Sequence, residues 1–358
     1  MKKLAIVLIF ALMIGIFAGC AGNVVIVGGC TCPTGSHGTV TEPTKPTIPK
    51  PTVPAGEGAL KTGLALIGNI AVGDKEPIAY DVTIVAVLVD DNGVIHDCII
   101  DSIGKEVGVG TNGTITADIT AAVETKNELG DRYNMVAWGG AIAEWYQQAE
   151  ALANFAIGKT VEELKNGAID ETGKAPAGSD LASSATIYLG GYVSAIEVAV
   201  NNAQHLGAQT GDELRMAVIS GMGSSVNATA EKNGTAQLDC DVTALTVKDG
   251  VITSCYIDAL QAKVEFNAKG EIVTKLPAAV ETKNQLGEKY NMVAWGGAIA
   301  EWNVQVASFC AYVTGKTAAQ VAGIAVNEGT KPTDADLSAS VTIAIGGFQA
   351  LIAKALGE

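Results

Sequence analysis

The order of apolar and polar positions predicts one β-hairpin in each half of the chain. Val82 to Val89 is an apolar, largely β-branched run, and Val94 to Ile100 alternates as a strand with one buried face does. Asn92-Gly93 stands between them and is typical of a tight hairpin turn. In the second half, Asp249-Gly250 takes the turn position and Val251 to Ile257 follows it. Both halves are therefore expected to contain an antiparallel hairpin.

Helical patterns follow each hairpin. Apolar residues recur at helical spacing at Ile142, Trp145, Ala149, Leu152 and Phe155. Gly158 then ends the run as a helix C-terminal glycine does. Thr160 with Glu163 forms a capping box, repeated as Thr317 with Gln320. Later helices are marked by Val193, Ile196 and Val200, and by Leu351 and Ile352 in the second half. Strands first and helices later predict the α+β class, with helices on one face of a small antiparallel sheet.

The chain is a tandem duplication. Residues 121–145 read AAVETKNELGDRYNMVAWGGAIAEW, and residues 278–302 read AAVETKNQLGEKYNMVAWGGAIAEW. The same offset of 157 residues relates Cys98 to Cys255, where an alternating strand position suits a buried thiol. We predict a first copy over residues 58–205 and a second over 206–358. Two units are fewer than a solenoid needs, so each copy is expected to hold its own core.

The N-terminal segment predicts export and anchoring. Lys2 and Lys3 precede an apolar run from Leu4 to Phe17, and small residues lead to Cys20, which is similar to a bacterial lipobox. We therefore expect residues 1–19 to be a lipoprotein signal peptide and Cys20 to be the lipidated residue; the alternative is an uncleaved membrane anchor. Residues 20–57 include a Pro/Thr-rich tether. Either reading places the body outside the cytoplasm, at the membrane or cell surface.

Composition excludes several classes of protein. The net charge of -15 offers no basic surface for nucleic acid, so no nucleic-acid partner is expected. Seven cysteines are present, but Cys20 is the predicted lipid site and Cys30 and Cys32 lie in the tether, so the chain is not a disulfide scaffold. His37, His96 and His205 are widely spaced and form no pattern for zinc or haem.

One short segment carries candidate chemistry. Residues 180–186 read Asp-Leu-Ala-Ser-Ser-Ala-Thr ahead of an apolar run, and residues 336–342 read Asp-Leu-Ser-Ala-Ser-Val-Thr. Acidic and hydroxylated residues in such a place often cap a helix, and Asp180 can be read as an ordinary N-cap. The alternative is that the hydroxyl of Thr186 is a site of covalent attachment.

The pattern Asp-x-x-Ser-Ser-Ala-Thr resembles the flavinylation motif of the FMN-binding domain family, which includes C-type subunits of sodium-pumping NADH:quinone reductases and Rnf G-type subunits. The resemblance covers the last two thirds of each copy. It implies FMN carried covalently by Thr186, with Asp180, Ser183 and Ser184 recognised by a flavin transferase. Thr342 and Asp336 are the corresponding residues of the second copy, whose motif departs at Ala339 and Val341.

The same resemblance implies roles for other residues. Glu124 and Thr125 open a segment leading to Leu-Gly that is similar to the family's Glu-Thr-Pro-Gly-Leu-Gly, with Lys-Asn-Glu in place of Pro-Gly. A threonine at a helix start would set the phosphodiester against free N–H groups. Trp138 and Trp295, beside glycine pairs, are candidate contacts for the flavin ring. Tyr133 and Met135 could serve too, or belong to the core, whereas Trp145 and Trp302 are assigned to the core.

The sequence thus predicts an exported, lipid-anchored electron-transfer flavoprotein in which FMN carries the redox chemistry. It is not expected to be an enzyme by itself, and its electron donor and acceptor are not identified by the sequence. The competing interpretation is a duplicated surface binding or structural module without a cofactor.

Overall fold

Each copy folds into a three-stranded antiparallel sheet followed by helices, which confirms the α+β class. The computed structural model describes residues 58–72, 77–276 and 280–358. The first sheet has the order β1 (Lys61–Ala71), β2 (Ile78–Val89), β3 (Ile95–Val107). The second has the order β4 (Glu213–Gly221), β5 (Gly234–Lys248), β6 (Val251–Phe266). The predicted hairpins are β2–β3 and β5–β6, and the outer strands β1 and β4 were not predicted.

The helices of the two copies correspond in order. In the first copy they are α1 (Lys126–Leu129), η1 (Gly130–Tyr133), α2 (Met135–Gly139), α3 (Trp145–Ala156), α4 (Val161–Ala168), η2 (Leu181–Ser183) and α5 (Gly190–Asn201). In the second they are α6 (Lys283–Leu286), η3 (Gly287–Tyr290), α7 (Met292–Gly296), α8 (Trp302–Val313), α9 (Ala318–Ala322), α10 (Ala335–Ser338) and α11 (Gly346–Leu356). The predicted capping boxes at Thr160 and Thr317 are confirmed, and Gly158 has a φ of +80° just past the end of α3.

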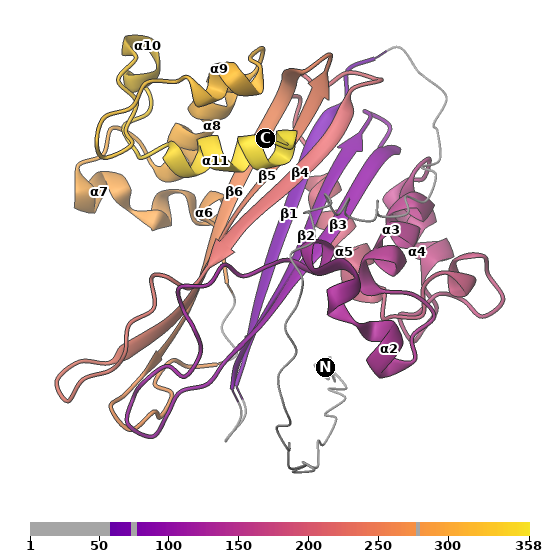
Figure 1. The fold of residues 1–358 in the computed structure, drawn as a ribbon. Helices are drawn as coiled ribbons and strands as arrows, with labels where there is room; N and C mark the ends of the chain where they lie inside the picture. Colours follow the sequence, from indigo (N-terminus) through magenta and orange to yellow (C-terminus); the bar gives the residue numbers. More distant parts are fainter. Residues whose placement is uncertain (1–57, 73–76, 277–279) are drawn as a thin grey trace, which may run out of the picture. The chain divides into compact units, whose positions relative to one another are not determined.

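Helices cover one face of each sheet. In the first copy α3 packs on β3, and α5 packs on β1 and β2; in the second, α8 packs on β6, and α11 packs on β4 and β5. Figure 1 shows the helices of the two copies on opposite sides of the paired sheets. Val85 and Val87 of β2 face the first set of helices, and Leu245 of β5 faces the second. Each copy therefore has a helix–sheet core of its own, as expected.

The other face of each sheet packs against the other copy. Alternate residues of β2, such as Ile84 and Leu88, lie in one apolar cluster with Leu238 of β5 and Leu260 of β6. Because both faces of β2 are buried, its sequence is a nearly continuous apolar run rather than an alternating one. The described residues consequently form four layers, in the order helices, sheet, sheet, helices.

Polar contacts also cross between the sheets. Tyr80 in β2 donates its hydroxyl to the carbonyl of Ala236 in β5 at 2.8 Å, and the hydroxyls of Thr62 and Ser254 lie 2.6 Å apart. All described residues belong to one compact unit. The predicted division between residues 205 and 206 falls between α5 and β4, but it separates two halves that share a core. Each copy thus has its own helix–sheet core and also shares a further apolar cluster with the other copy.

The predictions for residues 1–19, Cys20 and the tether to residue 57 lie outside the described residues. Within the described part of the chain, no helix is long and apolar enough to cross a membrane.

Candidate functional site

The candidate attachment residue Thr186 lies in a loop before α5. The turn η2 ends at Ser183, and the helix begins at Gly190, four residues after Thr186. The prediction that the threonine opens a helix is therefore wrong. The N–H groups of Leu189 and Gly190 bond to the carbonyl of Gly173, and the helix begins only there. Thr186 is an exposed residue.

The acidic residues of the two motifs do not act as predicted caps. Asp180 precedes η2, is exposed, and makes no capping hydrogen bond through its side chain. In the second copy Asp336 lies within α10, whose cap is Asp334. Ser183 and Ser184 are exposed beside Asp180. Asp180 thus stands at the N-cap position of η2 without capping it through its side chain, and it is exposed at the surface.

A buried glutamine holds each threonine loop. Gln148, in α3, is fully buried, and its Oε1 accepts the N–H of Thr186 at 2.8 Å and that of Ile187 at 3.2 Å. The hydroxyl of Thr186 lies 3.4 Å from the same oxygen. In the second copy Gln305 accepts the N–H of Thr342 at 2.8 Å, and the hydroxyl of Thr342 lies at 3.2 Å. The two threonines therefore have the same backbone support, although Thr342 is half-buried.

Gln148 was missed at the sequence level, although the sequence carries a signal for it. Between residues 146–155 and 303–312, the corresponding stretches of α3 and α8, only the glutamine is retained. Everything else in this stretch changes, which is usual for a helix that only packs. A polar residue that is retained at a buried position of this helix indicates a specific hydrogen-bonding role.

A second loop, residues 134–144, presents apolar side chains to solvent; we call it the Trp loop, with residues 291–301 as its counterpart. Glu144 is buried and accepts the N–H groups of Met135 at 2.8 Å and Val136 at 3.0 Å. Glu301 does the same for Met292 and Val293. Asn134 has a φ of +67°, a left-handed conformation that asparagine tolerates better than most residues. Hydrogen bonds to the side chain of Glu144 therefore hold the backbone of this segment in place.

The side chains that the Trp loop exposes are identical in the two copies. Trp138 is 79% exposed and Trp295 is 89% exposed. Their exposed apolar neighbours are Val136 and Ile142 in the first copy, and Val293 and Ile299 in the second. Ile142 was predicted to start a helix, which is wrong because Glu144 caps α3 and the helix starts at Trp145. Exposed apolar groups do not stabilise the fold, so their presence in both copies favours a binding role.

The same glutamine joins the two loops. Gln148 donates its Nε2 hydrogen to the carbonyl of Ala143 in the Trp loop at 2.8 Å, while its oxygen holds Thr186. In the second copy Gln305 donates to Ala300 at 2.7 Å. The threonine loop and the exposed apolar loop are therefore positioned by one buried amide group in each copy.

Aromatic residues that flank the Trp loop surround a lysine. Lys126 Nζ lies 5.1 Å from the ring centre of Trp145 and 5.4 Å from that of Tyr133. Lys283 has the same relation to Trp302 and Tyr290. Burial alone would lower the pKa of Lys126, but Tyr192, Tyr133 and Asp81 outweigh it and raise the pKa, so the group is a cation. Trp145 and Trp302 are buried, which confirms their assignment to the core.

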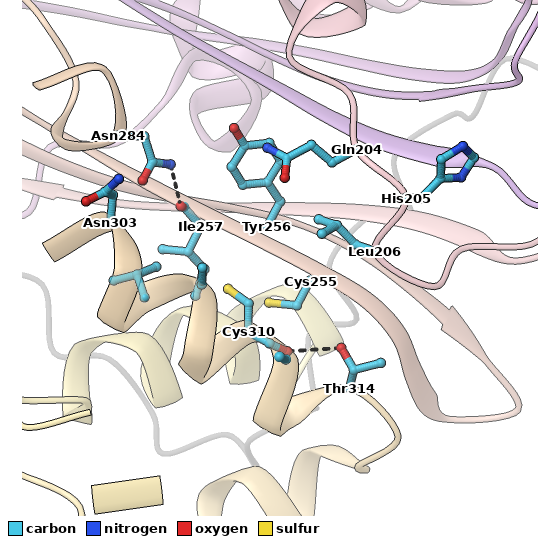
Figure 2. A pocket seen from close by; sticks show the side chains of 13 residues that line it. Gln204, His205, Leu206, Cys255, Tyr256, Ile257, Asn284, Asn303, Cys310 and Thr314 are labelled. Carbon is cyan, nitrogen blue, oxygen red and sulfur yellow. Dashed lines mark hydrogen bonds between the residues drawn. The ribbon is translucent and has the colours of Figure 1, made fainter. Parts of the chain in front are cut away.

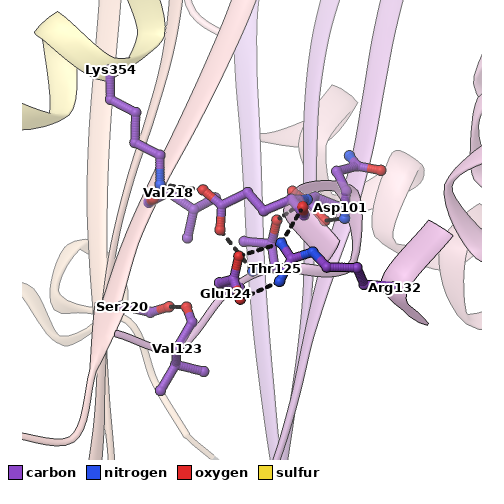
Figure 3. Close-up of polar contacts among 10 residues, drawn as sticks. Asp101, Val123, Glu124, Thr125, Arg132, Val218, Ser220 and Lys354 are labelled. Atoms are coloured by element: carbon purple, nitrogen blue, oxygen red, sulfur yellow. Dashed lines mark hydrogen bonds and ion pairs between the residues drawn. The ribbon is translucent and has the colours of Figure 1, made fainter. Parts of the chain in front are cut away.

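Glu124 and Thr125 contact other elements. Thr125 caps α1, accepting the N–H of Glu128 at 3.2 Å, and Glu124 pairs with Arg132 (Figure 3). The Lys-Asn-Glu sequence after Thr125 forms most of the short helix α1. The side chain of Thr125 therefore supports α1, and the side chain of Glu124 forms an ion pair at the surface.

Two buried aspartates support these short helices. Asp101 Oδ1 accepts the N–H of Asn127 at 3.1 Å, and Asp258 Oδ1 accepts that of Asn284 at 3.1 Å. Burial raises the pKa of each carboxyl to about 6, although hydrogen bonds to Thr125 and Thr282 respectively oppose the shift. Asp101 also lies near the contact where Lys354 of α11 pairs with Glu128 and donates to the carbonyl of Val218 (Figure 3).

Comparison with protein-family models, curated proteins and solved structures found no match for this chain.

Proposed function

We propose that this protein is a lipid-anchored flavoprotein outside the cytoplasm that carries FMN for electron transfer, with Thr186 and Thr342 as the attachment residues. The observation that carries the proposal is the exposed residue Thr186, which lies within a sequence that resembles a flavinylation motif and whose backbone N–H is held by Gln148. The second copy repeats this support through Gln305.

The surroundings of Thr186 suit covalent attachment by another protein. A flavin transferase must reach the Oγ1 atom, and Ser183 and Ser184 leave the approach lined by small, exposed side chains. The attachment would be a phosphodiester between Thr186 Oγ1 and FMN. Asp180 is exposed three and four residues before these serines, as a recognition residue for a transferase must be.

The Trp loop supplies a surface for the ring system of a flavin. A planar apolar ring needs apolar or aromatic contacts, and Trp138 and Trp295 are the large exposed aromatics of the two Trp loops. Gln148 links this loop to Thr186 through hydrogen bonds at both ends of its amide. When bound, the flavin would accept and donate electrons, and the protein would hold it and limit its exposure to water.

The exposed apolar groups also support a second candidate function. Val136, Trp138 and Ile142 could contact a partner protein directly, in a duplicated binding module without a cofactor. The two functions differ in one observable property, since only the first gives a protein that absorbs visible light.

The test is production of the chain together with a flavin transferase. We expect the purified, washed and denatured protein to keep a flavin absorbance band. Thr186→Val should lower the flavin-to-protein ratio, and Thr186→Val combined with Thr342→Val should abolish it, because valine keeps the shape of threonine but has no oxygen to esterify. A colourless wild-type protein, made with a transferase that modifies a known substrate in the same cells, would refute the flavin proposal and favour the binding module.

A further inference from the structure

A cavity in the second copy brings two cysteines together. It has a volume of about 540 Å³ and lies between β6, α8 and the segment that connects the two copies (Figure 2). Cys255 of β6 and Cys310 of α8 both line it, and both belong to the same apolar cluster of the second copy. Figure 2 shows both cysteine side chains at the place where the strand and the helix meet.

The pair exists in one copy only. Cys255 corresponds to Cys98 in the first copy, but the position of Cys310 is taken there by Ala153. A thiol at the strand position alone can be read as a small core residue, and all of these side chains are buried. The second thiol lies on the facing helix beside a cavity, where the first copy has alanine.

We propose that Cys255 and Cys310 are a dithiol modification site, which a small-molecule disulfide oxidises to an intramolecular disulfide that ties β6 to α8. The proposal is independent of the flavin. One cysteine thiolate attacks the small disulfide, forms a mixed disulfide and releases one small thiol. The second cysteine then attacks the mixed disulfide and releases the other small thiol. Two cysteine S–H groups are oxidised, and the small disulfide is reduced to two thiols that take up the two protons.

The cavity gives the reagent its access. Its wall is mixed, with apolar groups such as Val306 and Ala307 and the polar side chains of Asn284 and Asn303. The Oδ1 atom of Asn303 is buried and accepts no hydrogen bond within the described structure, so a small polar molecule with an N–H donor finds an acceptor there. An uncharged or cationic disulfide of a few heavy atoms fits this space, whereas a protein disulfide oxidant does not.

The reaction is slow in the reduced, folded protein. The hydrogen bond with Cys255 and burial raise the pKa of the Cys310 thiol well above its usual range, so little thiolate is present near neutral pH. Thiolates are the nucleophiles in disulfide exchange. Oxidation should therefore need long incubation, yet end in the intramolecular bond, because the second thiol lines the same cavity.

The disulfide would restrain the helix that supports the second threonine. Cys310 lies five residues after Gln305 in α8, and Gln305 holds Thr342. In the first copy α3 carries Gln148 but has Ala153 at the cysteine position. Oxidation is thus expected to stiffen the support of Thr342 and leave that of Thr186 unchanged.

The test uses the full chain, reduced and then incubated in the folded state with cystamine until no further thiol is lost. The protein is acid-quenched, unfolded, alkylated, digested and analysed by mass spectrometry without reduction. We expect a linked pair of peptides containing Cys255 and Cys310, with Cys98 and Cys240 recovered as alkylated thiols. Cys310→Ala, which copies the residue of the first copy, should give no linked pair.

Amide hydrogen exchange is the second readout, because it reports on the helices directly. Exchange in α8 should slow after oxidation by several fold, whereas exchange in α3 should not change. Recovery of both Cys255 and Cys310 as alkylated thiols, or as separate cysteamine adducts, would overturn the proposal. If Cys310→Ala does not fold, Cys255→Ala provides the same control from the strand side.

Discussion

Gln148 Oε1 accepts the backbone N–H of Thr186 at 2.8 Å from a fully buried position in α3. We predict that Gln148→Leu frees the threonine loop, since leucine fills the space but leaves the N–H groups of Thr186 and Ile187 without an acceptor. The cost should be about 1–3 kcal/mol of stability. Flavin on Thr186 should fall while flavin on Thr342 is unchanged, measured peptide by peptide. Gln305→Leu is the matched control and should show the opposite pattern; equal loss at both sites would point to general unfolding.

Truncation of the exposed and the buried tryptophan should change the free energy of unfolding by very different amounts. Trp138→Ala should change the free energy of unfolding by no more than about 0.5 kcal/mol, because the side chain is 79% exposed. Trp145→Ala should cost about 3–5 kcal/mol, because that ring lies in the core. Urea unfolding measures both. In flavinylated protein, Trp138→Ala should also raise flavin fluorescence from the first copy, and an unchanged emission would argue against contact between the ring and Trp138.

The buried carboxyls of Asp101 and Asp258 predict a fall in stability as the pH rises. Their folded pKa of about 6 lies above the usual value of 3.8, so the folded state binds more protons than the unfolded chain between these two pH values. Their stabilising contribution is therefore fully present below about pH 4 and is lost as the pH rises to 6. The loss should be roughly 3 kcal/mol for each carboxyl, from 1.36 kcal/mol per pKa unit.

Urea unfolding at several pH values between 4 and 7 measures this effect. Asp101→Asn combined with Asp258→Asn should flatten the dependence, since the amide keeps an acceptor oxygen and carries no charge. Asp118→Asn is the control, because Asp118 is exposed and its pKa is lowered by the Thr120 hydroxyl and N–H. A wild-type stability that rises steadily from pH 4 to 6 would contradict the assignment.

The shared core predicts that neither copy folds alone. A fragment of residues 58–205 would expose the face of its sheet that carries Ile84 and Leu88, and Tyr80 would lose its acceptor on Ala236. We expect no cooperative thermal transition from this fragment or from residues 206–358, and recovery of a transition when the two are mixed. A chain of residues 58–358 is the control for loss of the N-terminal segment. Two independent transitions from the separate fragments would show that the shared core is dispensable.

The sequence was most informative where local chemistry decides the structure. The Asn92-Gly93 and Asp249-Gly250 turns, the capping boxes and the burial of Trp145 depend on neighbouring residues, and all were predicted. Strands β1 and β4 were not predicted. The packing of one sheet on the other was not predicted either, because an apolar run such as β2 shows that both faces are buried but not which element covers the second face. The position of Thr186 was predicted wrongly because the start of α5 depends on hydrogen bonds to the carbonyl of Gly173, which lies outside the motif.

The candidate site was predicted only in part for a related reason. The motif identified Thr186, and the duplication identified Trp138. The two loops are connected by hydrogen bonds of Gln148. This role of Gln148 could not be predicted, because it depends on how α3 packs against both loops. Comparing the two copies position by position marks this glutamine, since it alone is retained among its neighbours. A buried polar residue that survives duplication while the surrounding core changes is therefore a useful guide to a site.

The most direct test of the flavin proposal is peptide mass spectrometry of the chain made with a flavin transferase. We predict an adduct of the mass of FMN on the peptide that contains residues 180–186, localised to Thr186, with lower occupancy on the peptide containing Thr342, because Ala339 and Val341 depart from the motif. Thr186→Val should remove the first adduct and leave the second. Unmodified peptides at both threonines, with a transferase that modifies a control substrate in the same cells, would contradict the account.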